Sequence, residues 1–132
     1  MSLDLPDHLT GWVLDVAALV SAVDRTVYAS TFLAIARREA TTLLIPAGVL
    51  TATLALRPNR GPLLAKLLGH SNVRLVDPDD PPADLGKFAE LLSGDLTAAH
   101  VVWLGVARDW PVLTDRGDYL RRAAPELMVI PA

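Results

Sequence analysis

Apolar residues in this chain fall into short continuous runs, separated by longer stretches in which apolar and polar positions mix. The runs have strand length and lack an alternating polar face, which is typical of strands buried on both faces of a sheet. They predict strands at residues 12–16, 41–46, 72–77, 111–114 and 127–130. The mixed stretches predict helices at residues 26–40, 47–56, 62–69, 83–92 and 97–108, with a helical turn at 119–124. Strands alternating with helices indicate βα units.

Helix-breaking residues mark the boundaries between these elements. Pro46 suits the first turn of the helix that follows it, and Gly69 suits the end of another. Residues 57–62 and 78–82 are rich in proline and glycine or aspartate and are predicted as loops. Asp95 or Thr97 is the expected cap of the helix that runs to Arg108. The sequence therefore predicts an α/β fold, a three-layer α/β/α sandwich with a mostly parallel five-stranded sheet, in a single domain spanning residues 1–132.

Composition agrees with a globular protein. The chain has 132 residues, of which 52% are hydrophobic and 20% charged, enough to build one core. It contains no cysteine, which excludes disulfides, cysteine-ligated zinc and thiol catalysis. The first ten residues lack the features of a secretory signal, and the longest apolar run, residues 42–56, is short and interrupted by Pro46 and Gly48. We expect a cytoplasmic protein without a membrane segment.

The net charge is −3, which provides no general affinity for nucleic acid. Local basic patches exist at residues 37–38, at Arg57 with Arg60, and at residues 121–122. Exposed arginines at helix ends are more often solvated surface than RNA contacts, and that interpretation is favoured.

Carboxylates follow several of the predicted strands. Asp15 ends the first strand, Asp77 the third, and Asp115 follows the fourth, with Asp118 three residues further on. Because the carboxyl ends of parallel strands share one edge of the sheet, Asp15 and Asp115 are expected at the same edge. Oxygen ligands clustered there would suit Mg²⁺ or Mn²⁺, which activate water for phosphoryl chemistry. The alternative is that these acids cap turns, although Asp15 sits at the edge of the core, where a charge is costly.

Other chemistry has weaker support in the sequence. The histidines are too scattered for a zinc site, and neither a phosphate-binding glycine loop nor a nucleophile elbow is present. His100 lies in an apolar helix and is interpreted as a partly buried histidine. The tryptophans are interpreted as core or interface residues rather than a stacking platform. These residues are His8, His70 and His100, and Trp12, Trp103 and Trp110.

The chain resembles the PIN domain, the fold of many VapC-like toxin ribonucleases from toxin–antitoxin pairs. The resemblance is carried by VLDVAALV, IPAGVLTATLAL and AAHVVWLGVARDWPVLTDRGDYLRRAAPELMVIPA, and it covers residues 12–130. It implies that Asp15 is the first metal-binding aspartate and that the acidic turn after Thr114 supplies another ligand, Asp115. It also implies a homodimer and an antitoxin-like protein partner.

The acidic set that the resemblance implies is incomplete. The small hydroxyl residue usual two positions after the first aspartate is replaced by Ala17. The family's glutamate falls on Ala52, and its next aspartate falls on Ala98. Asp15 and Asp115 are left, with Asp95 or Asp118 as substitutes if the site works. Fewer carboxylates mean weaker metal binding and less mutual repulsion for a metal to relieve.

Three hypotheses follow. The favoured one is a PIN-like protein with a degenerate site that holds no cofactor, is not a catalyst, and acts by binding a protein partner or RNA. The alternative is a Mg²⁺- or Mn²⁺-dependent endoribonuclease that uses Asp15 and Asp115 with help from Asp95 or Asp118. The third is an unrelated α/β protein, such as a small-ligand binder, in which the acids are turn caps.

Overall fold

The computed structural model describes residues 11–78 and 83–132, so most of the predicted turn at 78–82 lies outside the described residues. The strands are β1 (Gly11–Leu14), β2 (Thr42–Pro46), β3 (Val73–Val76), β4 (Val112–Thr114) and β5 (Val129–Pro131). The helices are α2 (Val16–Val23), α3 (Val27–Arg38), α4 (Ala47–Leu56), α5 (Gly61–Leu68), α6 (Ala83–Leu91), α7 (Leu96–Arg108) and α8 (Gly117–Leu120), with a 3₁₀ turn η2 (Pro58–Arg60).

The five strands form one sheet in the order β3-β2-β1-β4-β5, and every neighbouring pair is parallel. In the central strand, Val13 pairs with Leu44 on one side and with Val112 on the other. The central strands are almost fully buried, whereas the edge strands β3 and β5 are largely exposed. The predicted α/β class and parallel sheet are confirmed.

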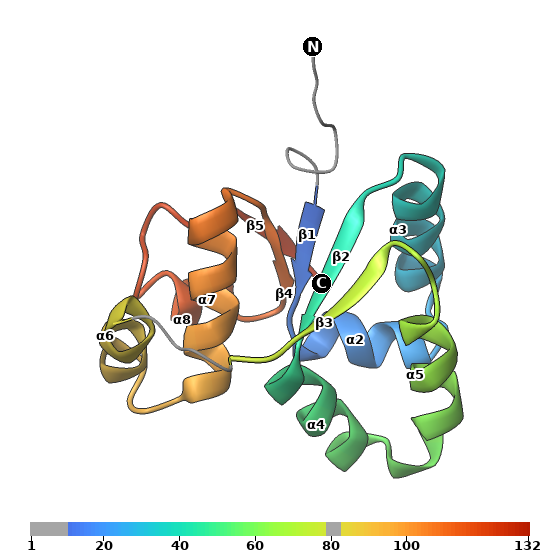
Figure 1. Ribbon diagram of the computed structural model, residues 1–132, viewed down its shortest axis with the longest axis horizontal. Helices are drawn as coiled ribbons and strands as arrows, with labels where there is room; N and C mark the ends of the chain where they lie inside the picture. The colour runs from blue at the N-terminus through green and yellow to red at the C-terminus, as the bar shows by residue number, and fades with distance from the viewer. Residues whose placement is uncertain (1–10, 79–82) are drawn as a thin grey trace.

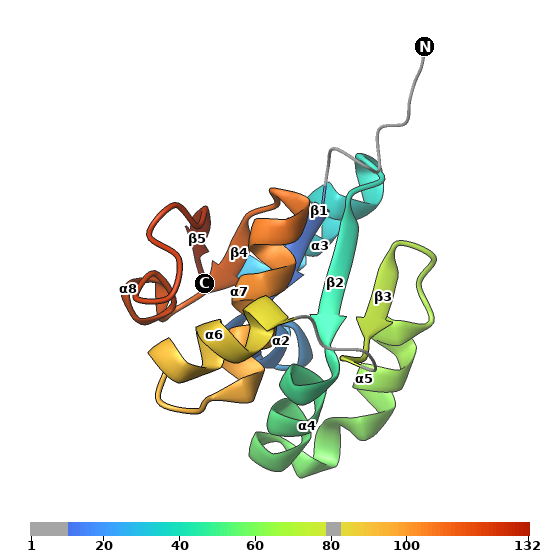
Figure 2. The same ribbon diagram turned by 60° about the vertical axis from the view of Figure 1, so that its left-hand side comes forward.

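Helices cover both faces of this sheet (Figure 1). The pair α6 and α7 lies on one side, and α2, α3 and α5 lie on the other. The strands β1 and β2 point towards the edge of the sheet at which α2 and α4 begin (Figure 2). A single large core cluster includes residues from the sheet and from both helical layers. Leu104 belongs to this core at 2% exposure, and Trp103, for which the sequence left core and interface open, packs half-buried against it.

The main difference from the sequence pattern lies after β1. The strand was predicted to run to residue 16, but it ends at Leu14, and α2 begins at Val16. The sequence of α2, VAALVSAV, is apolar on nearly every side, so it lacks the polar face by which periodicity identifies a helix. Pro46 also differs slightly, since it ends β2 and occupies the cap position of α4.

No single helix in the described part of the chain is long and apolar enough to cross a membrane. The pair α2 and α3 meets the length and composition criteria together but is bent by 99°.

Candidate functional site at the carboxyl edge of the sheet

The strand order reverses direction at the centre of the sheet. From β1 the chain moves outward through β2 and β3, and it then returns to β4 on the other side of β1. In open parallel sheets, the crevice beside such a switch point, at the carboxyl ends of the strands, is the usual ligand site. Asp15 directly follows β1 at this point, and Thr114 ends β4 beside it.

Asp15 is fully buried, and its carboxylate is held by two side chains from the segment around the end of β4. Thr114 donates a hydrogen bond from Oγ1 to Oδ2 over 2.7 Å. Arg116 donates from Nε to Oδ2 over 2.7 Å and from Nη2 to Oδ1 over 2.9 Å. This fork of two parallel bonds is the strong form of an arginine–carboxylate pair.

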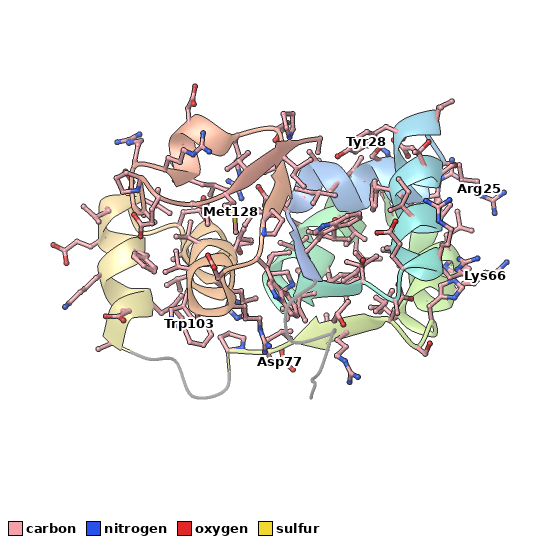
Figure 3. All side chains as sticks on the ribbon, turned by 90° about the horizontal axis from the view of Figure 1, so that it is seen from above. Arg25, Tyr28, Lys66, Asp77, Trp103 and Met128 are labelled. Carbon is pink, nitrogen blue, oxygen red and sulfur yellow. The ribbon has the colours of Figure 1, made fainter. Side chains whose placement is uncertain are left out.

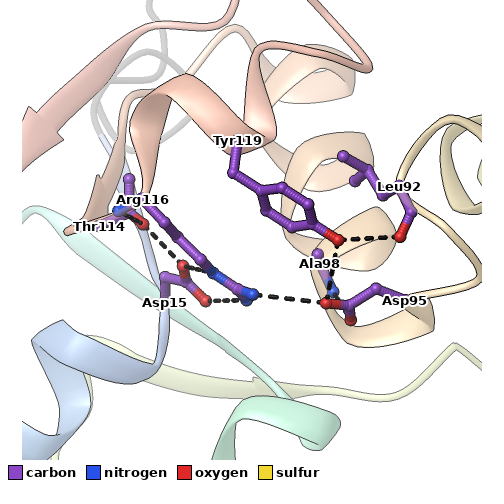
Figure 4. A network of polar contacts seen from close by, with 7 residues as sticks. All are labelled: Asp15, Leu92, Asp95, Ala98, Thr114, Arg116 and Tyr119. Atoms are coloured by element: carbon purple, nitrogen blue, oxygen red, sulfur yellow. Dashed lines mark hydrogen bonds and ion pairs between the residues drawn. The ribbon is translucent and has the colours of Figure 1, made fainter.

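Arg116 reaches a second acid across the switch point (Figure 4). Its Nη1 lies 3.4 Å from Oδ2 of Asp95, and its guanidinium lies 5.6 Å from the ring centre of Tyr119. The backbone N–H of Arg116 also donates to Oγ1 of Thr114 over 3.0 Å. The hydrogen bonds to Asp15 raise the pKa of the Arg116 guanidinium, so it keeps its charge.

Asp95 owes its position to helix α7. It is the N-cap, and its Oδ1 accepts a hydrogen bond from the backbone N–H of Ala98 over 2.9 Å. Its second oxygen is thereby free to face Arg116. Tyr119 from α8 closes the network by donating its hydroxyl to the carbonyl of Leu92 over 2.8 Å. The predicted cap is confirmed, with Asp95 rather than Thr97 in that role.

The arrangement does not fit a divalent cation as it stands. Both oxygens of Asp15 accept hydrogen bonds from Arg116, and one of them also accepts from Thr114, so a metal would have to displace the arginine. Within the described ranges, no group of three or more His, Cys, Asp or Glu is placed to hold a metal ion. The positive charge between Asp15 and Asp95 is supplied by the protein itself.

The other predicted acids lie apart from this network. Asp115 and Asp118 are exposed, and no hydrogen bond or ion pair joins either of them to Asp15 within the part of the chain that the structure describes. Asp115 lies in the wall of a hollow of about 630 Å³ beside α2, together with Arg116, and Asp118 lines a neighbouring hollow. The acid that the fold brings to Asp15 is therefore Asp95.

The two alanines that stand where the sequence resemblance implied acids are packed into their helices. Ala98 is fully buried and is bonded through its backbone N–H to Asp95. Ala52 is half-buried in α4, next to the buried Thr53, whose hydroxyl donates to the carbonyl of Val49. Thr53 supplies no carboxylate in place of Ala52, whereas the carboxylate beside Ala98 is that of the cap residue Asp95.

Sequence reasoning missed Arg116. The residue stands between two acids in TDRGD, where it reads as a solvated turn residue. The available signal was its position, two residues after a buried strand and thus at the same sheet edge as Asp15. A buried carboxylate needs a compensating charge, and Arg116 is a cation that the predicted topology brings near it.

Comparison with known proteins supports the fold alone. No family model and no curated protein matches this sequence. Among solved structures, the chain is similar to a chain of VapBC2 from Rickettsia felis, in a crystal structure with a DNA fragment from their promoter. The TM-score is 0.67 at 17% sequence identity, over 93% of this chain and 99% of that chain. The likeness therefore extends over nearly the whole length of both chains, and it shows that they share a fold.

Proposed function

We propose that this chain is a PIN-like protein in which Arg116 takes the place of the metal ion, and that it acts by binding a protein partner rather than by cutting RNA. The observation that carries this proposal is the two-bond pair between Arg116 and the fully buried Asp15. A guanidinium neutralises a carboxylate, but it cannot coordinate a water molecule or lower its pKa as a bound metal does. The chemistry that would generate a nucleophile is thus replaced by a structural ion pair.

The structural likeness and the net charge support the proposed class of partner. The neighbour in the comparison is a VapBC2 assembly, and the resemblance of the sequence implies an antitoxin-like partner. The net charge of −3 favours a protein over RNA, since affinity for RNA depends largely on neutralising phosphates. We propose an antitoxin-like protein as the partner and a homodimer as the assembly.

One observation favours the alternative, a Mg²⁺- or Mn²⁺-dependent endoribonuclease. Asp95 and Asp15 face Arg116 from two sides, at 3.4 Å and 2.7 Å from its nitrogen atoms. If the arginine swung out when RNA bound, these two carboxylates would face the same space and could share one hydrated cation. This alternative requires metal binding by the natural protein.

Calorimetric titration with Mn²⁺ and Mg²⁺ distinguishes the two functions. We expect no saturable binding to the natural protein at millimolar metal, because Arg116 occupies the position between the acids. Arg116→Ala is expected to bind metal in the millimolar range or tighter, and Asp15→Asn in that background should abolish the binding. Arg122→Ala is the matched control, because Arg122 lies over the same Tyr119 ring at 5.6 Å but has no contact with Asp15.

An RNA-cleavage assay with the same variants completes the test. No cleavage by the natural protein, with or without Mn²⁺, supports the proposal. Micromolar to low-millimolar metal binding by the natural protein, together with cleavage that Asp15→Asn abolishes, would overturn it in favour of the nuclease.

A further inference from the structure

Another hollow lies next to the start of α7, whose cap is Asp95, but it does not include Asp15 or Arg116. It is found where α4 and α7 begin, beside α6, and it has a volume of about 410 Å³. That volume falls in the range typical of small-molecule sites, about 300–1,000 Å³. It is lined by Gly48, Pro78, Leu85, Leu96, Thr97 and His100, so none of the residues that hold Asp15 takes part.

The walls of this pocket are mainly apolar, and its polar groups are few. Leu85 is buried, and Leu96 is 67% exposed, which places it at the mouth. Gly48 lets the two helix starts approach closely, because a Cβ there would lie 2.5 Å from Oγ1 of Thr97. Among the residues that the structure describes, none that lines the pocket carries a charged side chain at neutral pH, which favours an uncharged ligand.

His100 is the unusual member of the lining. It is only 4% exposed, and within the described residues its imidazole nitrogens form no hydrogen bond. Trp103 stacks beside it, with ring centres 6.4 Å apart and planes at 23°. Figure 3 shows Trp103 on α7 and Asp77 beyond β3 on the same side of the molecule. A buried polar group without a partner costs free energy, which a ligand that bonds to it would recover.

The protonation state of His100 defines what it can bind. Burial lowers the pKa of the imidazole, and the charge of Asp77 opposes this only in part. At neutral pH the ring is therefore uncharged, with one N–H donor and one bare nitrogen acceptor. The negative charge of Asp77 nearby disfavours an anionic ligand.

We propose that this pocket binds a small uncharged molecule of the phenol class, with its ring between Leu85 and Leu96 and its hydroxyl bonded to His100. A phenolic hydroxyl is a good donor to a neutral imidazole nitrogen, and a single substituted ring is compatible with about 410 Å³. The apolar lining holds the ring by burial, and the single buried histidine orients it. The pocket is not lined by Asp15, Thr114 or Arg116, so its binding is measured separately from the metal chemistry tested above.

Calorimetry of the full chain with 4-ethylphenol and with 4-ethylanisole tests the proposal. The two probes differ in that the ether lacks the hydroxyl hydrogen. We expect saturable binding of the phenol at least about tenfold tighter than that of the ether, the size of one buried hydrogen bond. In His100→Phe, which keeps a ring at this position, that preference should disappear while weak binding of both probes persists.

A second pair of variants locates the site without changing the core. Leu96→Trp places a bulky ring at the exposed mouth and should reduce the affinity for both probes at least about tenfold. This reduction corresponds to a loss of about 1.4 kcal/mol in binding free energy. Leu91→Trp is the matched control, since Leu91 is 53% exposed and does not line the pocket, and it should bind as the natural chain does. Equal affinity for the two probes, no saturable heat, or unchanged binding in Leu96→Trp would overturn the proposal.

Discussion

Asp15 and Arg116 form a partly buried ion pair whose members are structurally dependent on each other. The side chain of Asp15 is 1% exposed and that of Arg116 30% exposed, so the acid relies on the arginine for its compensating charge. Removing one partner of such a pair leaves an uncompensated buried charge, which typically costs about 3–5 kcal/mol. The pair therefore stabilises the fold whether or not the chain is bound to a partner. At this scale, the sequence singled out Asp15 because an acid at the edge of the core is costly to bury.

The second residue with an unusual environment is His100, and it predicts a pH dependence of stability. Burial lowers the pKa of the His100 imidazole in the folded protein, whereas the same group in the unfolded chain has a pKa of ~6.5. Between the folded and the unfolded pKa of His100, the unfolded state binds more protons than the folded state. The free energy of unfolding should therefore fall as the pH drops below ~6.5, and the loss from His100 should be absent above that pH. Urea denaturation at about pH 7.5 and about pH 5.5 measures the loss.

The control for this prediction is His100→Phe, in which the free energy of unfolding should fall less between the two pH values. The other histidines are common to both proteins and cancel in the comparison. An equal loss in both proteins would show that burial of His100 does not contribute to the acid sensitivity.

At the scale of elements, α7 links the candidate site to the core. Its first turn is capped by Asp95, its middle carries His100, and its last turns pack closely on the sheet through Gly105. The sequence predicted this helix and the bounds of α4 well, because both have clear start and stop signals. It did not predict α2, whose apolar composition provides no periodic signal.

The close packing of α7 on β4 leads to a prediction about two helical glycines. A Cβ at Gly105 would lie 2.9 Å from side-chain carbons of Val112 and Leu127, so Gly105→Ala should destabilise the protein by about 1–3 kcal/mol through overpacking. A Cβ at Gly86 in α6 would meet no atom within 4 Å, so Gly86→Ala should stabilise it by about 0.5–1 kcal/mol. Chemical denaturation of both variants measures the difference in sign. A Gly105→Ala protein as stable as Gly86→Ala would contradict this packing.

At the scale of the whole molecule, the strand order brings together segments that are far apart in sequence. The contact between Asp15 and Arg116 joins positions 101 residues apart. It exists because β4 returns to the centre of the sheet beside β1. Several large apolar side chains are exposed on the surface, including Val27 at 85% and Leu56 at 56%.

These exposed side chains bear on whether copies of the chain associate. We expect the proposed homodimer, because exposed apolar groups are removed from water when copies associate. Size-exclusion chromatography with light scattering should then report twice the chain mass of 14.2 kDa over a range of protein concentrations. A mass equal to that of one chain at every concentration would contradict the prediction.

The sequence by itself determined the alternation of strands and helices, the parallel sheet, the place of Asp15 at its carboxyl edge and the cap at Asp95. These are local features, since periodicity, capping residues and breakers act within one element or its neighbours. Only the tertiary structure decided that Arg116, rather than Asp115, faces Asp15, and that Asp95 is the second acid there. Such pairings depend on strand order and on side-chain direction, which residues distant in sequence set together. For this reason the sequence suggested a depleted metal site, whereas in the folded protein an arginine supplies the positive charge beside Asp15.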